Sequence, residues 1–146
     1  MTFIREKKIN GKQYAYLVKT VYTKRGPRQK VAKYLGKIHE MQCQKVEGHT
    51  PKEVMESLLV NLGFTKNRVW TKKEYSVSLV TGKVCYKNKK CVLKINHGYL
   101  WDSSIKKFLL PTRDPKELAE NMLRAGIPFN EETYFHLVKN IEHLGG

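Results

Sequence analysis

Basic and aromatic side chains alternate along residues 9–37, which read INGKQYAYLVKTVYTKRGPRQKVAKYLGK. Lysine and arginine neutralise phosphates, and tyrosine can stack on a base or donate its phenolic hydroxyl to a phosphate. Gly26 lies beside the basic pair Lys24-Arg25, and a residue without a side chain lets the backbone approach a phosphate closely. The chemistry that this segment suggests is the binding of a polyanion, and Arg25 and Arg28 are the first candidates for contact.

The candidate contacts extend to the neighbouring strands and to a second basic turn, YKNKK, at residues 86–90. They are Arg5, Lys7, Lys12, Tyr16, Lys19, Lys24, Arg25, Arg28, Lys30, Lys33, Lys87, Lys89 and Lys90. The second turn, with Lys83 close by, has an alternative interpretation, because lysines at a hairpin tip keep a strand edge from pairing with other chains. The tyrosines of the first segment also fit either a buried sheet face or an exposed stacking surface. They are Tyr14, Tyr16, Tyr22 and Tyr34.

Residues 3–38 resemble a known family. They contain the pattern GKxYxYLV, a short basic turn, and then RQxxxKYLG. The matching residues are Gly11, Lys12, Tyr14, Tyr16, Leu17, Val18, Arg28, Gln29, Lys33, Tyr34, Leu35 and Gly36. This pattern is similar to the N-terminal segment of transposases related to the IS1634 and IS4 groups. The resemblance implies a DNA-contacting sheet but not strand transfer, since the other roughly 110 residues do not resemble the acidic-triad nuclease of such transposases and are too short to contain it.

Residues that could support catalysis or bind a metal are sparse. His97, Asp102 and Glu74 are the polar candidates of the middle segment, and no Walker loop, GxGxxG or GxSxG motif is present. The three cysteines form no CxxC pair, whereas structural zinc sites need four ligands at short paired spacing. They are Cys43, Cys85 and Cys91. We therefore expect a non-enzymatic protein with reduced cysteines, no cofactor and no metal, and a small metal-dependent nuclease that uses His97 is an alternative.

Positive charge is concentrated in the first three quarters of the chain. The 28 Lys and Arg exceed the 13 Asp and Glu, giving a net charge of +15. Residues 1–50 carry 12 basic and 3 acidic side chains, residues 51–110 carry 12 and 4, and residues 111–146 carry 4 and 6. Such a field attracts polyanions, so we expect nucleic acid as the partner, with duplex DNA ahead of RNA. The alternatives are an RNA- or ribosome-associated protein, a module that binds an acidic protein, and a charge that serves solubility.

Membrane association is not expected. No apolar run approaches the roughly 20 residues that cross a bilayer, and the first residues lack the apolar stretch of a secretory signal. No basic amphipathic helix is visible that would bind an anionic membrane surface. These features predict a cytoplasmic protein.

An α+β fold must position the basic residues. Residues 1–48 predict a basic three-stranded antiparallel meander with strands at 3–9, 13–24 and 29–35. Asn10-Gly11 favours a type I′ turn, because both of its positions need positive φ. Residues 25–28 predict the second turn, and Gly36 is expected to end the third strand.

Two further segments follow the meander. Residues 49–111 predict a helix with a capping box at Thr50 and Gly63 at its end, followed by antiparallel strands at 68–80, 84–87 and 91–96. A short helix capped by Asp102 or Ser103 completes this segment. Residues 112–146 predict a helical hairpin that packs or forms a homodimer, because its second helix begins with two acidic residues that would repel DNA. Its apolar residues are Leu118, Met122, Leu123, Phe135, Leu137, Val138 and Ile141.

Overall fold

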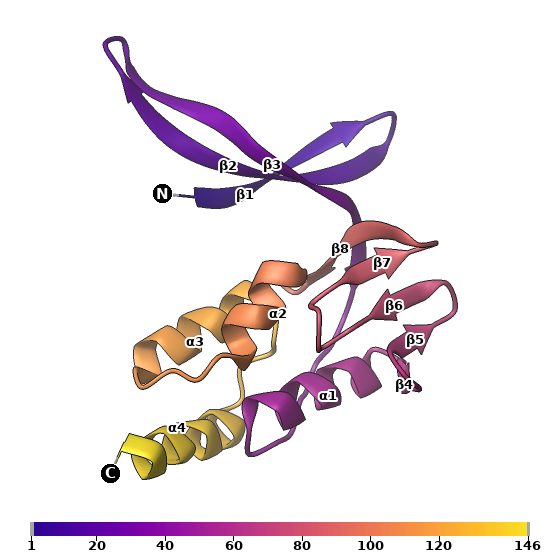
Figure 1. Cartoon of the computed structure of the whole chain (residues 1–146), viewed down its shortest axis with the longest axis vertical. Coiled ribbons are helices and arrows are strands. Elements are labelled where there is room, and N and C mark those ends of the chain that lie inside the picture. Colours follow the sequence, from indigo (N-terminus) through magenta and orange to yellow (C-terminus); the bar gives the residue numbers. More distant parts are fainter. Residues whose placement is uncertain (1, 146) are drawn as a thin grey trace.

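The computed structural model describes the backbone of residues 2–145 and the side chains up to residue 141. It is an α+β fold in which four helices pack against one part of a sheet and the first three strands extend beyond them (Figure 1). The strands are β1 (Thr2–Ile9), β2 (Lys12–Thr23), β3 (Gly26–Met41), β4 (Thr65–Lys66), β5 (Trp70–Lys72), β6 (Tyr75–Val77), β7 (Val84–Tyr86), β8 (Lys89–Ile95) and β9 (Gly98–Leu100). The helices are α1 (Pro51–Asn61), α2 (Asp102–Leu109), α3 (Pro115–Arg124) and α4 (Glu131–Gly145).

The strands form one continuous mixed sheet. Their order is β1-β2-β3-β8-β7-β6-β5-β4, and β9 also pairs with β8. The pairing of β3 with β8 is parallel, from Lys37 opposite Cys91 to Met41 opposite Ile95, and the other pairs are antiparallel. The predicted meander and the predicted second antiparallel sheet are therefore joined through this parallel pair.

Gly36 does not end the third strand, and this prediction was wrong. The strand β3 continues through Gly36 to Met41. Gly36 has φ +128°, and a Cβ atom built there would lie 2.5 Å from the carbonyl oxygen of Lys90 and 2.9 Å from the Cα of Cys91. Glycine is needed because the start of β8 passes against the backbone of β3 at this point.

Three other predicted boundaries are corrected. The turn after β2 is the two-residue loop Lys24-Arg25, so Arg28 lies within β3. The predicted strand at 68–80 is divided into β5 and β6, because Lys73 adopts φ +52° in a tight turn between them. The N-cap of α2 is Trp101, and neither Asp102 nor Ser103 has that role.

Local signals position the other helices as predicted. The Thr50 side chain accepts from the backbone N–H of Glu53 at 3.2 Å, and Pro51 begins α1. The Asp114 side chain accepts from the N–H of Lys116 at 3.0 Å at the start of α3. These bonds satisfy backbone donors that have no partner inside the helix.

The main core lies between the helices and the β5–β9 part of the sheet. Leu58, Leu93 and Phe108 are among its fully buried side chains and come from α1, β8 and α2. Of the apolar residues predicted to pack in the tail, Leu118, Met122 and Leu137 are buried here, and Val138 and Ile141 pack against them. The other two, Leu123 and Phe135, are exposed by 63% and 55%.

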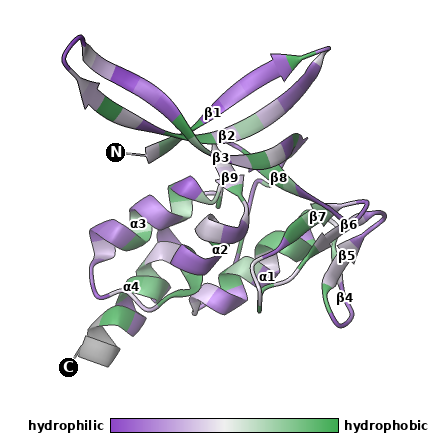
Figure 2. Cartoon of the chain, turned by 45° about the horizontal axis from the view of Figure 1, so that its top comes forward, coloured by the Kyte–Doolittle hydropathy of each residue, from purple (hydrophilic) through white to green (hydrophobic). Residues whose placement is uncertain are grey.

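A second, smaller core fixes the meander to the body. It contains Ala15 of β2, Leu35 and Ile38 of β3, and Val92 of β8, with Tyr99 and Trp101 packed against them. Figure 2 shows long hydrophilic stretches on the strands of the meander, which crosses above the helical body.

A polar contact lies beside this second core. Glu6 of β1 accepts from the Lys94 ammonium at 2.7 Å and from the Tyr99 hydroxyl at 2.6 Å. These two donors hold the pKa of the Glu6 carboxyl below its usual value. Burial, together with the hydrogen bond to Glu6, raises the pKa of the Tyr99 phenol. The contact links the first strand of the meander to the β8–β9 hairpin.

No helix among the described residues has the length and apolar character needed to cross a membrane.

Candidate nucleic-acid interface

Four basic residues of the meander lie on one face of the β2–β3 pair. In the strand register, Lys19 is opposite Lys30, Val21 is opposite Arg28, and Leu17 is opposite Lys33. Residues that are paired across antiparallel strands point to the same side, and so do alternate residues along β2. Leu17 and Ala15 of the same side pack in the second core. We call the set Lys19, Arg28, Lys30 and Lys33 the cationic face.

A β-bulge gives the cationic face its fourth member. The register shifts between Leu17 and Val18, so that Ala32 is an extra residue in β3. Without it, simple alternation from Lys30 would place Lys33 on the opposite side of the sheet. The bulge returns Lys33 to the side of Lys30, and all four members of the cationic face are exposed.

The cationic face carries charge without a counter-charge. Lys19 and Lys30 are directly opposite each other, and like charges in this position destabilise a sheet. Within the described part of the chain, no member of the cationic face lies within ion-pair distance of a carboxylate. The acidic residue of β1, Glu6, is already bonded to Lys94 and Tyr99. An anion bound across these two strands would relieve the repulsion.

The cationic face continues onto a ribbon that extends away from the body. The first residue of β1, Thr2, is opposite Lys19, and β1 does not extend past it toward the tip. The pairs of β2 with β3 from Thr20–Gln29 to Thr23–Gly26 therefore form a two-stranded arm. Figure 1 shows the tip of this arm at the upper left, away from the helices. Lys24 and Arg25 form the exposed tip loop. We call residues 19–30 the arm.

The opposite side of the meander is aromatic. Tyr16 is opposite both Arg5 and Tyr34, and Tyr14 is opposite Lys7, so these side chains share the side that faces away from the second core. The centre of the Tyr34 ring lies 5.1 Å from the centre of the Tyr16 ring and 6.4 Å from that of the Tyr14 ring. None of the three tyrosines belongs to a core cluster. We call Tyr14, Tyr16 and Tyr34 the aromatic face. Tyr34 is exposed, and Tyr14 and Tyr16 are half-buried outside both cores.

The second basic turn adjoins the base of the arm. Lys90 donates to the backbone carbonyl of Tyr34 at 2.9 Å, and its ammonium lies 5.6 Å from the centre of the Tyr34 ring. A hollow of about 330 Å³ brings Lys33, Lys83 and Lys90 together, with Trp101 in its lining. Lysines from the two predicted basic regions thus meet at this hollow. Lys87 is instead paired with Glu74 at 3.7 Å.

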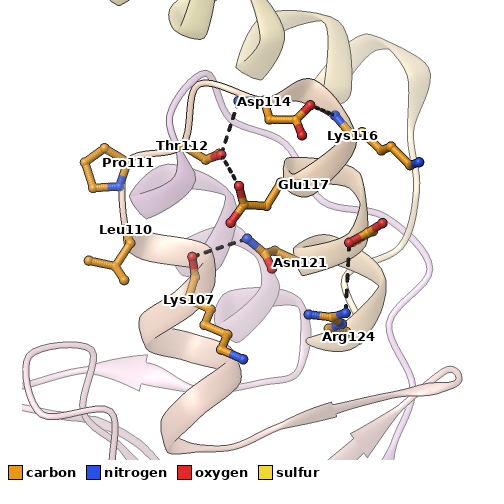
Figure 3. A pocket seen from close by; sticks show the side chains of 10 residues that line it. Lys107, Leu110, Pro111, Thr112, Asp114, Lys116, Glu117, Asn121 and Arg124 are labelled. Atoms are coloured by element: carbon orange, nitrogen blue, oxygen red, sulfur yellow. Dashed lines mark hydrogen bonds and ion pairs between the residues drawn. The ribbon is translucent and has the colours of Figure 1, made fainter. Parts of the chain in front are cut away.

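A larger hollow between α2 and α3, of about 560 Å³, is less suited to an anion (Figure 3). Its lining mixes basic and acidic side chains, and the acidic groups are occupied. Glu117 accepts from the Thr112 hydroxyl at 3.1 Å, and Glu120 lies 3.9 Å from Arg124. Asn121 donates to the Lys107 carbonyl at 3.5 Å. The Asn121 bond joins α3 to α2, and the three carboxylates of the lining, those of Asp114, Glu117 and Glu120, offset its cations.

The candidates for catalysis are dispersed. His97 is exposed in the turn between β8 and β9, Glu74 is paired with Lys87, and Asp102 is paired with Lys106 at 2.9 Å. Among the described residues, no group of three or more His, Cys, Asp or Glu side chains could hold a metal ion. The three cysteines are free thiols, and burial raises the pKa of Cys91 to about 12.

The predicted contacts fall into three groups. Lys19, Lys24, Arg25, Arg28, Lys30 and Lys33 belong to the cationic face and the arm tip. Arg5, Lys7, Lys12 and Tyr16 share the side of the aromatic face. Lys87, Lys89 and Lys90 belong to the second turn. The predicted contacts thus lie on two sides of the meander and at the second turn, and this division depends on register and bulges.

Two residues of the interface were not predicted as contacts. Lys83 and Trp101 line the hollow at the base of the arm. The sequence offered a signal for Lys83, which lies close to the basic turn at 86–90, and none for Trp101.

Comparisons of the chain with protein-family models, with curated proteins and with solved structures gave no match. The resemblance of residues 3–38 to transposase N-terminal segments stays a prediction.

Proposed function

We propose that the protein binds duplex DNA through the cationic face and the tip of the arm, without catalysing a reaction on it. The observation that carries the proposal is the directly opposed pair Lys19 and Lys30 on an exposed ribbon, where neither lysine has an ion-pair partner among the described residues. A protein that did not bind an anion there would gain stability by replacing one of the two lysines.

The shape of the arm favours duplex DNA over duplex RNA. The DNA major groove is about 12 Å wide and admits a two-stranded β-ribbon, whereas the major groove of A-form RNA is deep and narrow. The arm has two strands from Thr20 to its tip, and its charged tip loop, Lys24-Arg25, can contact the phosphates that border a groove. The same ribbon could meet RNA only along its outer surface, with fewer contacts.

Salt dependence provides the test. Each phosphate that is neutralised adds about 0.9 to the slope of log affinity against log salt for duplex DNA. Replacing Lys19, Arg28 and Lys30 by glutamine should therefore lower this slope by about 2 to 3. Fluorescence polarisation with a labelled 20-base-pair duplex between 50 and 300 mM salt measures it.

A matched variant separates a local site from general attraction. Lys52, Lys107 and Lys116 are exposed on α1, α2 and α3, so their replacement by glutamine removes the same total charge from the body. The proposal expects this variant to keep most of the slope. Equal losses in both triple variants would mean that the net charge and not the cationic face attracts DNA. Tighter binding to a duplex RNA of the same length would favour an RNA-associated function.

The homodimer predicted through the C-terminal helices stays a proposal. The exposure of Leu123 and Phe135 supports it, because both apolar side chains lie on the helices concerned. Sedimentation equilibrium tests it: the wild type should dimerise and the Phe135→Glu variant should be monomeric, whereas a monomeric wild type would exclude it.

A further inference from the structure

Exposed apolar side chains of the meander gather on one side. Phe3 of β1 and Val31 of β3 are both opposite Val18 of β2, and Tyr34 is opposite Tyr16. These side chains therefore share the side of the aromatic face. Phe3, Val31 and Tyr34 are exposed by 38%, 49% and 41%. The side of the cationic face has no large exposed apolar residue in β1 to β3 among those described. The two sides therefore differ in chemistry.

Cations border the aromatic face. The Lys7 ammonium lies 5.3 Å from the centre of the Tyr16 ring, and that of Lys90 lies 5.6 Å from the centre of the Tyr34 ring. Arg5 is opposite Tyr16 and donates to the Gln29 side chain at 3.1 Å, which holds the guanidinium along the edge of this surface. Aromatic rings flanked by ammonium and guanidinium groups form a surface that suits a flat, anionic ligand.

The charge of this surface selects among the possible occupants. A second copy of the chain would bring Arg5 and Lys7 against their own equivalents, and like charges across an interface are unfavourable. The two carboxylates of β1 to β3 lie on the other side: Glu6 points to its Lys94 and Tyr99 partners, and Glu40 is the alternate residue after Ile38 of the second core. Unpaired bases supply flat apolar surface for the tyrosines, and their backbone supplies phosphates for the bordering cations.

We propose that the aromatic face binds single-stranded nucleic acid, with bases stacked on Tyr34 and Tyr16 and phosphates held by Lys7, Arg5 and Lys90. Most of this site lies on the opposite side of the meander from the cationic face, and the two surfaces meet at the hollow that Lys33, Tyr34 and Lys90 line. The duplex contacts proposed for Lys19, Arg28 and the arm tip lie away from that hollow. Stacking of one base on an aromatic ring strengthens binding by roughly 5- to 100-fold, and it tolerates any base because every base has a flat face. The protein would thus hold duplex on one side of its sheet and unpaired strand on the other.

Substitutions at Tyr34 test the proposal, because this ring is the most exposed of the three. Tyr34→Leu keeps an apolar side chain but removes the ring, and Tyr34→Phe keeps the ring but removes the hydroxyl. With a labelled 15-nucleotide oligothymidine at about 0.1 M salt, Tyr34→Leu should weaken binding about tenfold and Tyr34→Phe less than threefold. Both variants should bind the 20-base-pair duplex within about twofold of the wild type, which also shows that they are folded.

Crosslinking provides a second measurement. Ultraviolet irradiation of the wild type with oligothymidine, followed by mass spectrometry, should identify Tyr34 or Tyr16 as a crosslinked residue. Equal affinity of the wild type and Tyr34→Leu for the oligonucleotide, or crosslinks confined to residues outside the meander, would overturn the proposal. A dimer of the wild type that Tyr34→Leu dissociates would also overturn it, since the aromatic face would then bind a second copy. If the variant with glutamine at positions 19, 28 and 30 loses duplex binding but keeps oligothymidine binding, the result would support a separate single-strand site.

Discussion

Replacement of Gly36 by alanine should weaken the contact between the meander and the body far more than a typical glycine substitution. The new Cβ would lie 2.5 Å from the Lys90 carbonyl oxygen and 2.9 Å from the Cys91 Cα, and both of these are backbone atoms of β8. The backbone of Gly36 has φ +128°, which costs about 1–2 kcal/mol for a residue with a Cβ. Displacement of β8 adds about 1–3 kcal/mol. The total, roughly 2–5 kcal/mol, is a large part of the stability of a small domain.

The matched control is Gly11→Ala in the first hairpin turn. Gly11 also has positive φ, +77°, but a Cβ built there meets no atom within 4 Å. It should therefore lose only the backbone cost, about 1–2 kcal/mol. Urea unfolding followed by tryptophan fluorescence gives the free energy of unfolding of both variants. Equal losses at Gly36 and Gly11 would refute the reasoning, because they would show that β8 does not pass against β3 at Gly36.

Three other predictions concern the body and its contact with the meander. Glu6→Gln should lower the free energy of unfolding by about 1 kcal/mol at pH 7; because the folded-state pKa of Glu6 is depressed, its contribution is present above pH ~4.5 and is lost as the pH falls further, so wild-type and variant melting temperatures should converge near pH 3. Thr50→Ala should cost about 1 kcal/mol in urea unfolding, since it removes the N-cap of α1. At pH 8, iodoacetamide should modify the partly exposed Cys85 before Cys91, which is buried and whose pKa is raised to about 12, as mass spectrometry would show.

Each of these predictions can fail in its own way. A constant difference between wild type and Glu6→Gln from pH 7 to pH 3 would mean that the carboxylate charge contributes nothing to the contact. An unchanged unfolding midpoint for Thr50→Ala would mean that α1 is held by packing alone. Faster modification of Cys91 than of Cys85 would contradict the burial of Cys91 in β8.

Local chemistry made the turns and caps predictable from the sequence. Asn10 and Gly11 both have positive φ, 53° and 77°, as the Asn-Gly pair requires. Thr50 and Asp114 accept from backbone donors at the starts of α1 and α3. In each case, the residue lies within four positions of the turn or helix start that it determines.

Long-range pairing could not be predicted from local signals. The residues around Gly36 predict that a strand ends there. In the structure, Gly36 instead lets the backbone of β8, more than fifty residues later, pass close to β3. The parallel pairing of β3 with β8 has no signature in either strand alone.

The candidate interface shows the same limit. The basic residues were evident from composition and spacing, but period-2 alternation separates Lys33 from Lys30, and the bulge at Ala32 brings them together. Burial of a tyrosine also depends on what covers it. Tyr14, Tyr16 and Tyr34 have the spacing of a core face, yet the second core forms on the other side, around Ala15 and Leu35.

The most direct test of DNA binding by the cationic face is lysine footprinting. Reductive methylation with and without a 20-base-pair duplex, read by mass spectrometry, compares the reactivity of individual lysines. The account predicts that DNA slows the labelling of Lys19, Lys30 and Lys33 several-fold and leaves Lys52 and Lys116 unchanged. Uniform protection of all five lysines, or protection confined to Lys52 and Lys116, would contradict it.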